Sequence, residues 1–386
     1  MNGRTNLQKQ KFHFDPLLVA VTVSLLFIGY VMVASSSLHL GLELKQDSFH
    51  YPAKQLAHIV LGLGLAAGVT RIPMESWEKI GPGLFIAGLF LLVIVFIPGL
   101  GVRVNGALRW LSIGGIRIQV SEVVKLFAVI YMAGYVTRHQ DNLQGSSYGI
   151  IKPLLLFSVA CVLLLREPDY GSAVVIMMIA MGAMFLGGAR LAQFISLLSV
   201  LVVLGVIVAL KEDYRIARLL SFIDPFKYQQ KEGYQLTQAL IAFGRGEWLG
   251  VGLGSGIQKL FYLPEAHTDF LFSVIGEELG LLGVVTVIVL YTLLIWRTFT
   301  VAVAAEQEGQ RFSAFVAYGL GVWLGFQSFV NMGVNMGILP TKGLTLPLMS
   351  YGGSSMIVMC CALALLFKVH SETVALNVQT PKERST

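Results

Sequence analysis

Long runs of apolar residues, separated mostly by short polar stretches, dominate the pattern of this chain. A helix needs about 20 predominantly apolar residues to cross a hydrocarbon core about 30 Å thick. Runs of adequate length predict ten membrane-spanning helices, near residues 16–36, 54–70, 80–97, 121–137, 150–165, 171–188, 191–210, 270–295, 312–333 and 346–367. The predicted fold is therefore an all-α polytopic membrane protein, with a single membrane domain over residues 1–386.

The one long polar interruption covers residues 211–270, and we expect it to be an extracytoplasmic loop. Four apolar residues in it follow the spacing of an amphipathic helix that can lie on or dip into the outer interface: Leu236, Ala239, Leu240 and Phe243. The glycine-rich stretch 244–256 either brings backbone close to a ligand or forms a flexible connector. Because the loop ends in the acidic cluster LPEAHTDF, we interpret it as the mouth of an active site.

Composition agrees with a membrane protein, since 55% of the residues are hydrophobic and only 13% are charged. The first apolar run is long for a signal segment and lacks a small-residue cleavage site, so an uncleaved first span is expected. All three cysteines, Cys161, Cys360 and Cys361, lie in apolar segments and imply neither a disulfide framework nor a zinc site. The net charge of +6 suits anionic lipid head groups or a phosphorylated substrate. No nucleic-acid partner is expected.

The distribution of Lys and Arg predicts that both termini are cytoplasmic, because that orientation puts thirteen cations inside and seven in short outer loops. Several polar residues then gather on the outer side, and cations there oppose the usual trend, which indicates that function retains them. These residues include Arg103, Arg109, Arg117, Glu122, Lys125, Arg166, Asp169, Asp269 and Lys342.

Glu122 and Lys125 are three residues apart in a predicted span, so they share a helix face and can pair. A charge inside a span costs roughly 2.5–3.5 kcal/mol on insertion scales, so the pair should face protein or water. It is either a structural salt bridge between helices or the polar wall of a substrate cavity.

Two outer segments, VNGALRWL (104–111) and LREPDYGSA (165–173), are predicted to be polar turns. Arg109 beside Trp110 fits a phosphate contact or an interfacial anchor equally well. Asp169 precedes a span and is expected to cap its helix.

Asp269 is the strongest candidate for chemistry, because it opens span eight at the boundary between water and lipid. The helix N-terminus favours its charged form, while desolvation opposes it. It can be a general base for a hydroxyl or a simple helix cap. Glu265 and His267 lie in the same turn region, whereas Glu277 and Glu278 lie deeper and are interpreted as structural.

The segment TKGLTLPLMSYGGSS (341–355) leads into span ten. Lys342 lies at its mouth, and Pro347 with Gly352 and Gly353 is expected to break or bend the helix. Irregular polar backbone at membrane depth is tolerated where it lines a cavity.

The motifs NGALRWL, QVSEVVKL, EPDYGSA, YLPEAHTDF and NMGVNMGILPTKGLTLPLMSYGGSS closely resemble those of the SEDS family of polytopic peptidoglycan polymerases. The resemblance runs from residue 105 to residue 355, and TKGLTLP is similar to the cell-division branch. It implies a glycosyltransferase that polymerises lipid II during septal synthesis in the bacterial inner membrane, with Asp269 as the catalytic base. The implied substrate-binding residues are Arg109, Glu122, Lys125, Arg166, Glu265, His267, Lys342 and Ser350.

The resemblance also implies a class B penicillin-binding transpeptidase and other division proteins as partners, besides lipid II and the growing glycan strand. No obligatory cofactor is implied. The chain has no DxD or HExxH site, so a divalent cation (Mg²⁺ or Mn²⁺) would be held partly by pyrophosphate oxygens. A lipid II flippase and a non-catalytic division scaffold are the rival functions.

Overall fold

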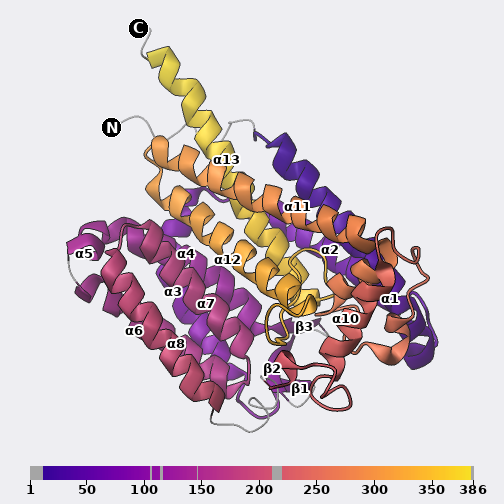
Figure 1. The fold of residues 1–386 in the computed structure, drawn as a ribbon. Coiled ribbons are helices and arrows are strands. Elements are labelled where there is room, and N and C mark those ends of the chain that lie inside the picture. The colour runs from indigo at the N-terminus through magenta and orange to yellow at the C-terminus, as the bar shows by residue number, and fades with distance from the viewer. Residues whose placement is uncertain (1–11, 105–106, 114–115, 146, 211–219, 384–386) are drawn as a thin grey trace.

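The computed structural model describes residues 12–104, 107–113, 116–145, 147–210 and 220–383. Ten apolar helices in these residues form one bundle, and eight of them are long and apolar enough to cross a membrane (Figure 1). They are α1 (Pro16–Lys45), α2 (His50–Val69), α3 (Met74–Ile94), α4 (Val120–Arg138), α6 (Ser147–Arg166), α7 (Tyr170–Leu186), α8 (Leu191–Leu210), α11 (Leu271–Gln307), α12 (Arg311–Asn335) and α13 (Gly353–Glu383). Each coincides with one predicted span, so the predicted fold class is confirmed.

Helix boundaries depart from the predicted spans where a helix continues beyond the apolar run. α1 begins at Pro16 because the Asp15 side chain caps it, accepting a hydrogen bond from the Leu18 amide at 3.0 Å. It ends at Lys45, and α11 ends at Gln307, both well past the predicted limits. An apolar run marks the hydrocarbon region, whereas a helix can extend into the polar interface.

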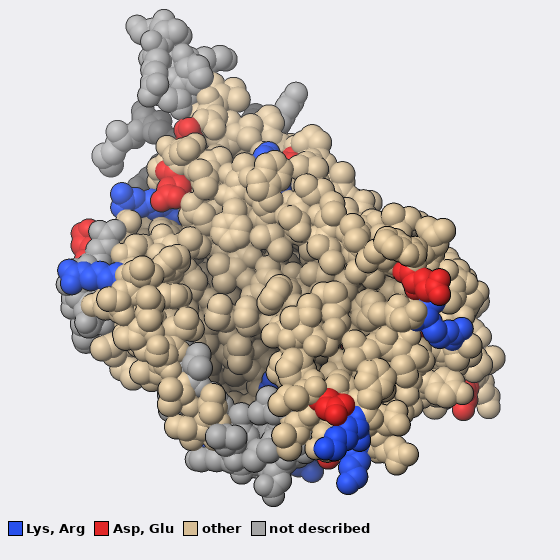
Figure 2. All heavy atoms as spheres, in the orientation of Figure 1, with Lys and Arg blue, Asp and Glu red and all other residues tan. Residues whose placement is uncertain are grey.

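The two termini lie at one end of the bundle, and a small sheet with helix α10 (Tyr234–Gly246) lies at the other end (Figure 1). Most of α4 and of α12 is buried, so these two helices form the centre of the bundle. Figure 2 shows a wide face nearly free of charged side chains, as a surface against lipid requires. The short helix α5 (Gln140–Gly145) connects α4 to α6.

The segment between α3 and α4 forms an antiparallel sheet, and this corrects the interpretation of residues 104–111 as a polar turn. Its strands, in the order β1-β2-β3, are β1 (Gly101–Val104), β2 (Ala107–Ile113) and β3 (Ile116–Gln119). Trp110 is opposite Val102 on one side and Gln119 on the other. The overlooked signals are alternating β-branched residues and the turn-forming Asn-Gly and Gly-Gly pairs of the sequence.

The predicted amphipathic helix is confirmed as α10, but its apolar face packs on protein. Leu236 and Ala239 are buried, and the Phe243 ring lies 5.8 Å from that of Phe272 in α11. A Cβ on Gly246 would lie 1.8 Å from the carbonyl oxygen of Gly276. The glycine-rich stretch thus brings backbone close to another helix, which is neither of the two predicted roles.

Helix α11 is interrupted at Gly280, whose φ of 63° is in the region that favours glycine. The glycine-rich stretch enters this break, where the Leu281 amide donates to the Glu247 carbonyl at 2.9 Å and the Leu282 amide to the Trp248 carbonyl at 3.2 Å. The stretch is therefore bonded to the bundle by its backbone.

Glu277 and Glu278 are buried beside this break and are structural, as predicted. Glu277 accepts hydrogen bonds from Arg245 and from the amide of Ile257. Glu278 pairs with Lys259 at 2.5 Å, in the helical turn Gln258–Tyr262. The two carboxylates therefore hold the segment between α10 and α11 against α11.

Candidate functional site

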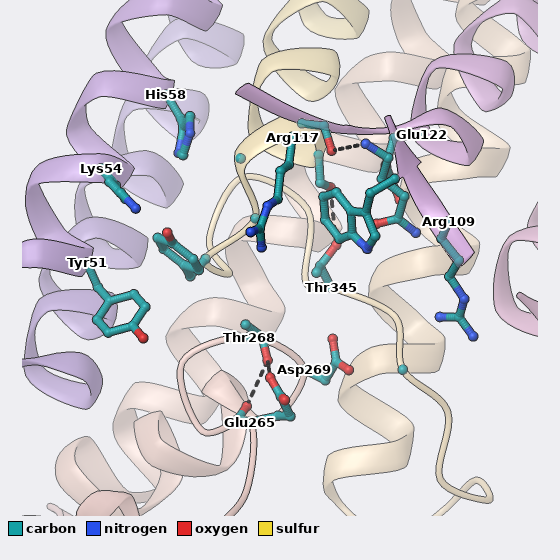
Figure 3. Close-up of a pocket in the computed structure, with 18 of the residues that line it drawn as sticks. Tyr51, Lys54, His58, Arg109, Arg117, Glu122, Glu265, Thr268, Asp269 and Thr345 are labelled. Carbon is teal, nitrogen blue, oxygen red and sulfur yellow. Dashed lines mark hydrogen bonds between the residues drawn. The ribbon is translucent and has the colours of Figure 1, made fainter. Parts of the chain in front are cut away.

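A cavity of about 960 Å³ lies at the end of the bundle that carries the sheet (Figure 3). Residues of α1, α2, β2, β3, α4 and α7 line it, together with the turn before α11 and the segment before α13. Four of the predicted site residues are in the lining: Arg109, Glu122, Glu265 and Asp269. Segments far apart in sequence therefore converge on one cavity, as the sequence predicts.

Asp269 belongs to a tight turn in which the Glu265 carbonyl accepts hydrogen bonds from the amides of Thr268 and Phe270, both at 3.1 Å. Its carboxylate lies against Gly343, where an added Cβ would be 2.9 Å from Oδ2. Among the described residues, no hydrogen bond reaches this carboxylate. The N-cap of α11 is Phe270, which has no capping side chain, so Asp269 does not cap the helix.

Burial raises the pKa of Asp269 from 3.8 to about 7. The nearby Glu265 carboxylate raises this pKa further, Arg109 lowers it, and Asp169 adds a smaller increase. Desolvation thus outweighs the helix N-terminus that was expected to keep the group ionised. A pKa near neutrality suits a general base, because the group can both accept and release a proton at working pH.

Glu265 and His267 flank Asp269 in different ways. Glu265 is exposed, and its carboxylate accepts a hydrogen bond from the Thr268 hydroxyl at 2.7 Å (Figure 3). The His267 ring is not part of the lining but packs behind two lining tyrosines, Tyr51 and Tyr351. Burial lowers the pKa of His267, although the Glu265 charge opposes this, so its ring is neutral at physiological pH.

The segment from Thr341 to Gly352 is irregular backbone packed inside the bundle, and α13 starts only at Gly353. The expected break in span ten is confirmed, and the segment lines the cavity at Gly343, Leu344 and Thr345. Ser350 is buried, and its hydroxyl accepts a hydrogen bond from the Leu346 amide at 2.9 Å. The structure therefore gives Ser350 a role in shaping this segment.

The Glu122–Lys125 pair is a salt bridge within α4, and Lys125 also bonds to α12. The Lys125 ammonium is fully buried, 2.7 Å from Glu122 Oε1 and 3.1 Å from Gln327 Oε1 in α12, and so joins two helices. Glu122 also lines the cavity. The Gln327 amide continues the network by donating to the Thr345 carbonyl at 2.9 Å. The pair therefore supports the cavity wall from behind.

Arg109 extends from β2 to the turn between α6 and α7. Its guanidinium donates to the carbonyls of Glu167 at 3.0 Å and Pro168 at 2.6 Å. In the same turn, Asp169 caps α7 as predicted, accepting a hydrogen bond from the Ser172 amide at 3.2 Å. Arg109 is thus held in one orientation beside the cavity.

Glu167 was not predicted, and its carboxylate is fully buried without a hydrogen-bond partner among the described residues. Burial raises the pKa of Glu167 to about 8; the Asp169 charge adds to this and Arg109 opposes it. Its negative neighbour Asp169 and its burial both favour the neutral acid.

Five predicted residues are not in the cavity lining: Lys125, His267 and Ser350, which are described above, and Arg166 and Lys342. Arg166 is exposed at the end of α6. Lys342 is also exposed, but it is adjacent to the lining residue Gly343, and its ammonium lies 5.6 Å from the centre of the Tyr170 ring. Lys342 is therefore at the cavity edge.

Several residues of α1, α2 and β3 that line the cavity were not among the predicted site residues. Lys45, Lys54 and Arg117 were counted as outer cations but were not selected, and Tyr51 and His58 carried no signal. The three cations could have been found because Lys and Arg on the predicted outer side oppose the usual preference for the cytoplasmic side. No motif or spacing identifies the aromatic residues.

Within the described residues, no group of three or more His, Cys, Asp or Glu side chains is arranged to hold a metal ion. Three acids line the cavity: Glu122, which is paired with Lys125, and Glu265 and Asp269 of the turn before α11. A divalent cation would therefore need ligands from a bound substrate.

Almost the whole chain matches one known protein family. The model of the family of FtsW, RodA and SpoVE, described as "Cell cycle protein", matches residues 16–375. The chain belongs to this family. It is the SEDS family whose motifs the sequence resembles.

Relatives within the SEDS family are similar over nearly the whole chain. A probable peptidoglycan glycosyltransferase FtsW of Methylomonas methanica is 61% identical over 97% of this chain and 97% of that protein. The corresponding protein of Methylococcus capsulatus is 56% identical over 95% of this chain and 92% of that protein. The similarity to the cell-division branch is confirmed.

Solved structures share the SEDS fold. One chain, from a structure reported as "Structural coordination of polymerization and crosslinking by a peptidoglycan synthase complex", is 29% identical, with a TM-score of 0.76 over 94% of this chain and 99% of that chain. The rod shape determining protein RodA of Thermus thermophilus is 27% identical, with a TM-score of 0.67 over 92% of this chain and 96% of that chain.

Proposed function

We propose that this SEDS protein is the peptidoglycan glycosyltransferase of cell division, which polymerises lipid II into β-1,4-linked glycan strands. The observation that carries the proposal is the Asp269 carboxylate, which faces the cavity without a hydrogen-bond partner among the described residues and has a pKa of about 7. The identity of its relatives and the solved synthase complex support the same activity.

In the proposed reaction, Asp269 accepts the proton of the 4-hydroxyl of the acceptor GlcNAc. The oxygen forms a bond to the anomeric carbon of the donor MurNAc. The bond from that carbon to the pyrophosphate oxygen breaks, and undecaprenyl pyrophosphate leaves with the electron pair. Attack opposite the leaving group inverts the α-linkage to a β-linkage.

The leaving pyrophosphate develops negative charge, which fixed cations stabilise. Arg109 suits this task, because it lines the cavity and the turn at Glu167 and Pro168 fixes its orientation. Lys342 would add charge at the cavity edge. Lys125 would act through Glu122 and the Thr345 segment, since its ammonium is fully buried.

The cavity also bears on the two rival functions. A flippase moves its substrate between both faces of the membrane, whereas the elements that line this cavity gather at the end of the bundle opposite the termini (Figure 1). A scaffold would not require an unbonded carboxylate with a pKa near 7. Both features favour the enzyme.

We further propose that both termini are cytoplasmic, that the cavity faces outward, and that the protein works at the division septum of the inner membrane. The charge distribution of the short loops supports this orientation. A class B penicillin-binding transpeptidase and other division membrane proteins are the proposed partners. The solved complex of a related chain supports a partner synthase.

We propose no obligatory cofactor. A Mg²⁺ or Mn²⁺ ion, where one takes part, would be held partly by pyrophosphate oxygens, since these ions prefer oxygen ligands.

Incubation of the purified protein with labelled lipid II, alone and with its transpeptidase partner, tests the function. The native chain should form glycan polymers, and Asp269→Asn should reduce the rate by about 10²–10⁴-fold, as expected for loss of a general base. Asn keeps the shape of the side chain but is not basic. A native rate in Asp269→Asn would exclude Asp269 as the base and would make Glu265 the next candidate.

A further inference from the structure

The cavity carries cations on two sides of Asp269 rather than on one. Arg109, from β2, is on one side, and Lys54, from α2, is on the other, with Arg117 of β3 directed into the space between (Figure 3). Lys45, at the end of α1, also lines the cavity. Two separate positive regions suit two separate anionic groups.

Three cations of the lining, one each on α1, α2 and β3, are not paired within the described residues. Lys45, Lys54 and Arg117 are exposed, and no carboxylate among the described residues forms an ion pair with any of them. By contrast, the buried cation of the cavity wall, Lys125, is paired with Glu122. Exposed cations with no protein partner, lining a concave site, raise the local concentration of anionic ligands.

An aromatic surface lies next to Lys54 and reaches the turn that holds Asp269. Tyr51 and Tyr351 both line the cavity, with ring centres 5.5 Å apart, and the ring of His267 is 5.2 Å from Tyr51 and 5.4 Å from Tyr351. The amide of Tyr351 donates to the His267 carbonyl at 2.9 Å, which joins this surface to the Asp269 turn. Aromatic rings in such contacts hold one another in place and offer apolar area with a polar edge.

The chemistry of the two substrates distinguishes the two positive regions. In the donor, the pyrophosphate is bonded to the reacting carbon, so it must lie close to the catalytic base. In the acceptor, a whole disaccharide separates the pyrophosphate from the reacting hydroxyl. Arg109 is close enough to lower the pKa of Asp269. Lys54 is not among the charges that shift this pKa, and it lies on α2, on the side of the cavity opposite Arg109 (Figure 3).

We propose that Lys54 and Arg117 bind the pyrophosphate of the acceptor lipid, and that Tyr51 and Tyr351 support its disaccharide so that the terminal hydroxyl reaches Asp269. This inference rests on the proposed function. Arg109 then serves the donor pyrophosphate on the opposite side. His267 is a positioning residue, because its ring packs against both tyrosines without lining the cavity.

Two lipid II analogues separate the subsites. An analogue with a methylene in place of the anomeric oxygen can only accept, because its pyrophosphate cannot leave. An analogue with galactose on the GlcNAc 4-hydroxyl can only donate. The purified protein in nanodiscs of zwitterionic lipid should join the two into one product, and the KM of each analogue is measured with the other in excess.

Lys54→Ala and Arg117→Ala should each raise the KM of the acceptor analogue about tenfold or more, as expected for loss of a charge-assisted contact, with the donor KM little changed. Arg109→Ala should raise the donor KM instead. Tyr51→Ala should raise the acceptor KM, and Tyr51→Phe should restore it because the apolar ring remains. Lys79→Ala, which removes an exposed lysine of α3 paired with Glu75, is the matched control and should change neither constant.

Direct binding of a fluorescent acceptor analogue gives a readout that does not depend on turnover. Lys54→Ala should weaken this binding about tenfold, whereas Asp269→Asn should leave it near the native value. Unchanged acceptor binding in Lys54→Ala and Arg117→Ala, or a larger effect on the donor analogue, would overturn the proposal. So would an effect seen only with phosphatidylglycerol in the nanodisc, which would assign these cations to lipid head groups.

The same experiment distinguishes failure of this inference from failure of the proposed function. A native protein that binds the acceptor analogue through Lys54 but forms no polymer from lipid II would contradict the enzymatic function alone. A protein that polymerises lipid II with a native acceptor KM in Lys54→Ala would contradict the subsite alone.

Discussion

Asn331 donates a side-chain hydrogen bond to the backbone carbonyl of Asp269 at 2.9 Å. The same amide nitrogen donates to the carbonyl of Leu344 at 2.6 Å, so one side chain of α12 holds both walls of the cavity that meet at Gly343. One turn later, Asn335 donates to the same Asp269 carbonyl at 2.9 Å. The position of the proposed base is therefore set by two buried amides that do not line the cavity themselves.

Asn331→Ala should lower kcat about tenfold or more while the protein remains folded, because the Leu344 carbonyl loses this donor, the Asp269 carbonyl keeps only the donor from Asn335, and the Asp269 turn loosens. The apparent pKa of the pH–rate profile should also shift, which a purely structural effect on the fraction folded would not cause. Ser328→Ala is the control, since this buried hydroxyl bonds only to carbonyls of its own helix. Equal losses in both variants would contradict a positioning role for Asn331.

The rate should rise with pH through the pKa of Asp269. Because the base must be deprotonated and its pKa is about 7, kcat/KM should fall about tenfold per pH unit below pH 7 and level off above it. Glu265→Gln removes a charge that raises this pKa, so the midpoint should move to lower pH. A profile that is flat between pH 5 and 8 would argue against Asp269 as the base.

The same shift predicts that Asp269→Asn stabilises the protein. A carboxyl whose pKa is raised in the folded state binds more protons folded than unfolded between its ordinary pKa of 3.8 and about 7. Native stability therefore falls as pH rises through this window, and the loss is complete above it. Asn is neutral, so Asp269→Asn does not undergo this loss of stability. At pH 8 the variant should melt at a higher temperature than the native chain. Near pH 4 the two melting temperatures should differ less. Thermal unfolding in detergent at the two pH values measures this.

The ten helices and the position of Asp269 beside a cavity could be predicted from the sequence, since apolar runs and an acidic residue at a span boundary are local signals. The sequence was insufficient for the contacts of Asp269, because Asn331 and Asn335 are ordinary polar residues of a predicted span. The pKa of Asp269 could not be predicted either. Whether it rises or falls depends on how far desolvation outweighs the effect of the helix N-terminus. Tyr51 joins the cavity only through the packing of α2 against α13.

Orientation predicts chemical access from one side of the membrane. Gln229 is exposed in the outer loop, so Gln229→Cys should react with an impermeant maleimide in intact spheroplasts. Gln258 is a poor reporter because it is buried. Lys79→Cys, at the opposite end, should react only after permeabilisation, and the native cysteines should be replaced first. Reversed accessibility of the two positions would place the cavity on the cytoplasmic side.

The last prediction concerns the break in α11 at Gly280, where the backbone of residues 247–252 is bonded to α11. Its φ of 63° and ψ of −160° are a conformation essentially limited to glycine, and an added Cβ would lie 2.3 Å from the Gly250 amide nitrogen. Gly280→Ala should therefore destabilise the protein by roughly 1–3 kcal/mol from backbone strain alone, with the clash adding to this. Activity should fall too, because the loop leads directly into the turn that holds Asp269.

Gly244→Ala is the matched control for Gly280→Ala. Gly244 lies in α10, is exposed, and has no atom within 4 Å of an added Cβ. Alanine there should stabilise the helix by roughly 0.5–1 kcal/mol. A lower melting temperature in Gly280→Ala and a higher one in Gly244→Ala would show that the backbone conformation at Gly280, rather than the loss of a glycine, causes the destabilisation. A Gly280→Ala protein with native melting temperature and activity would show that α11 can close this break, and that the loop does not depend on it.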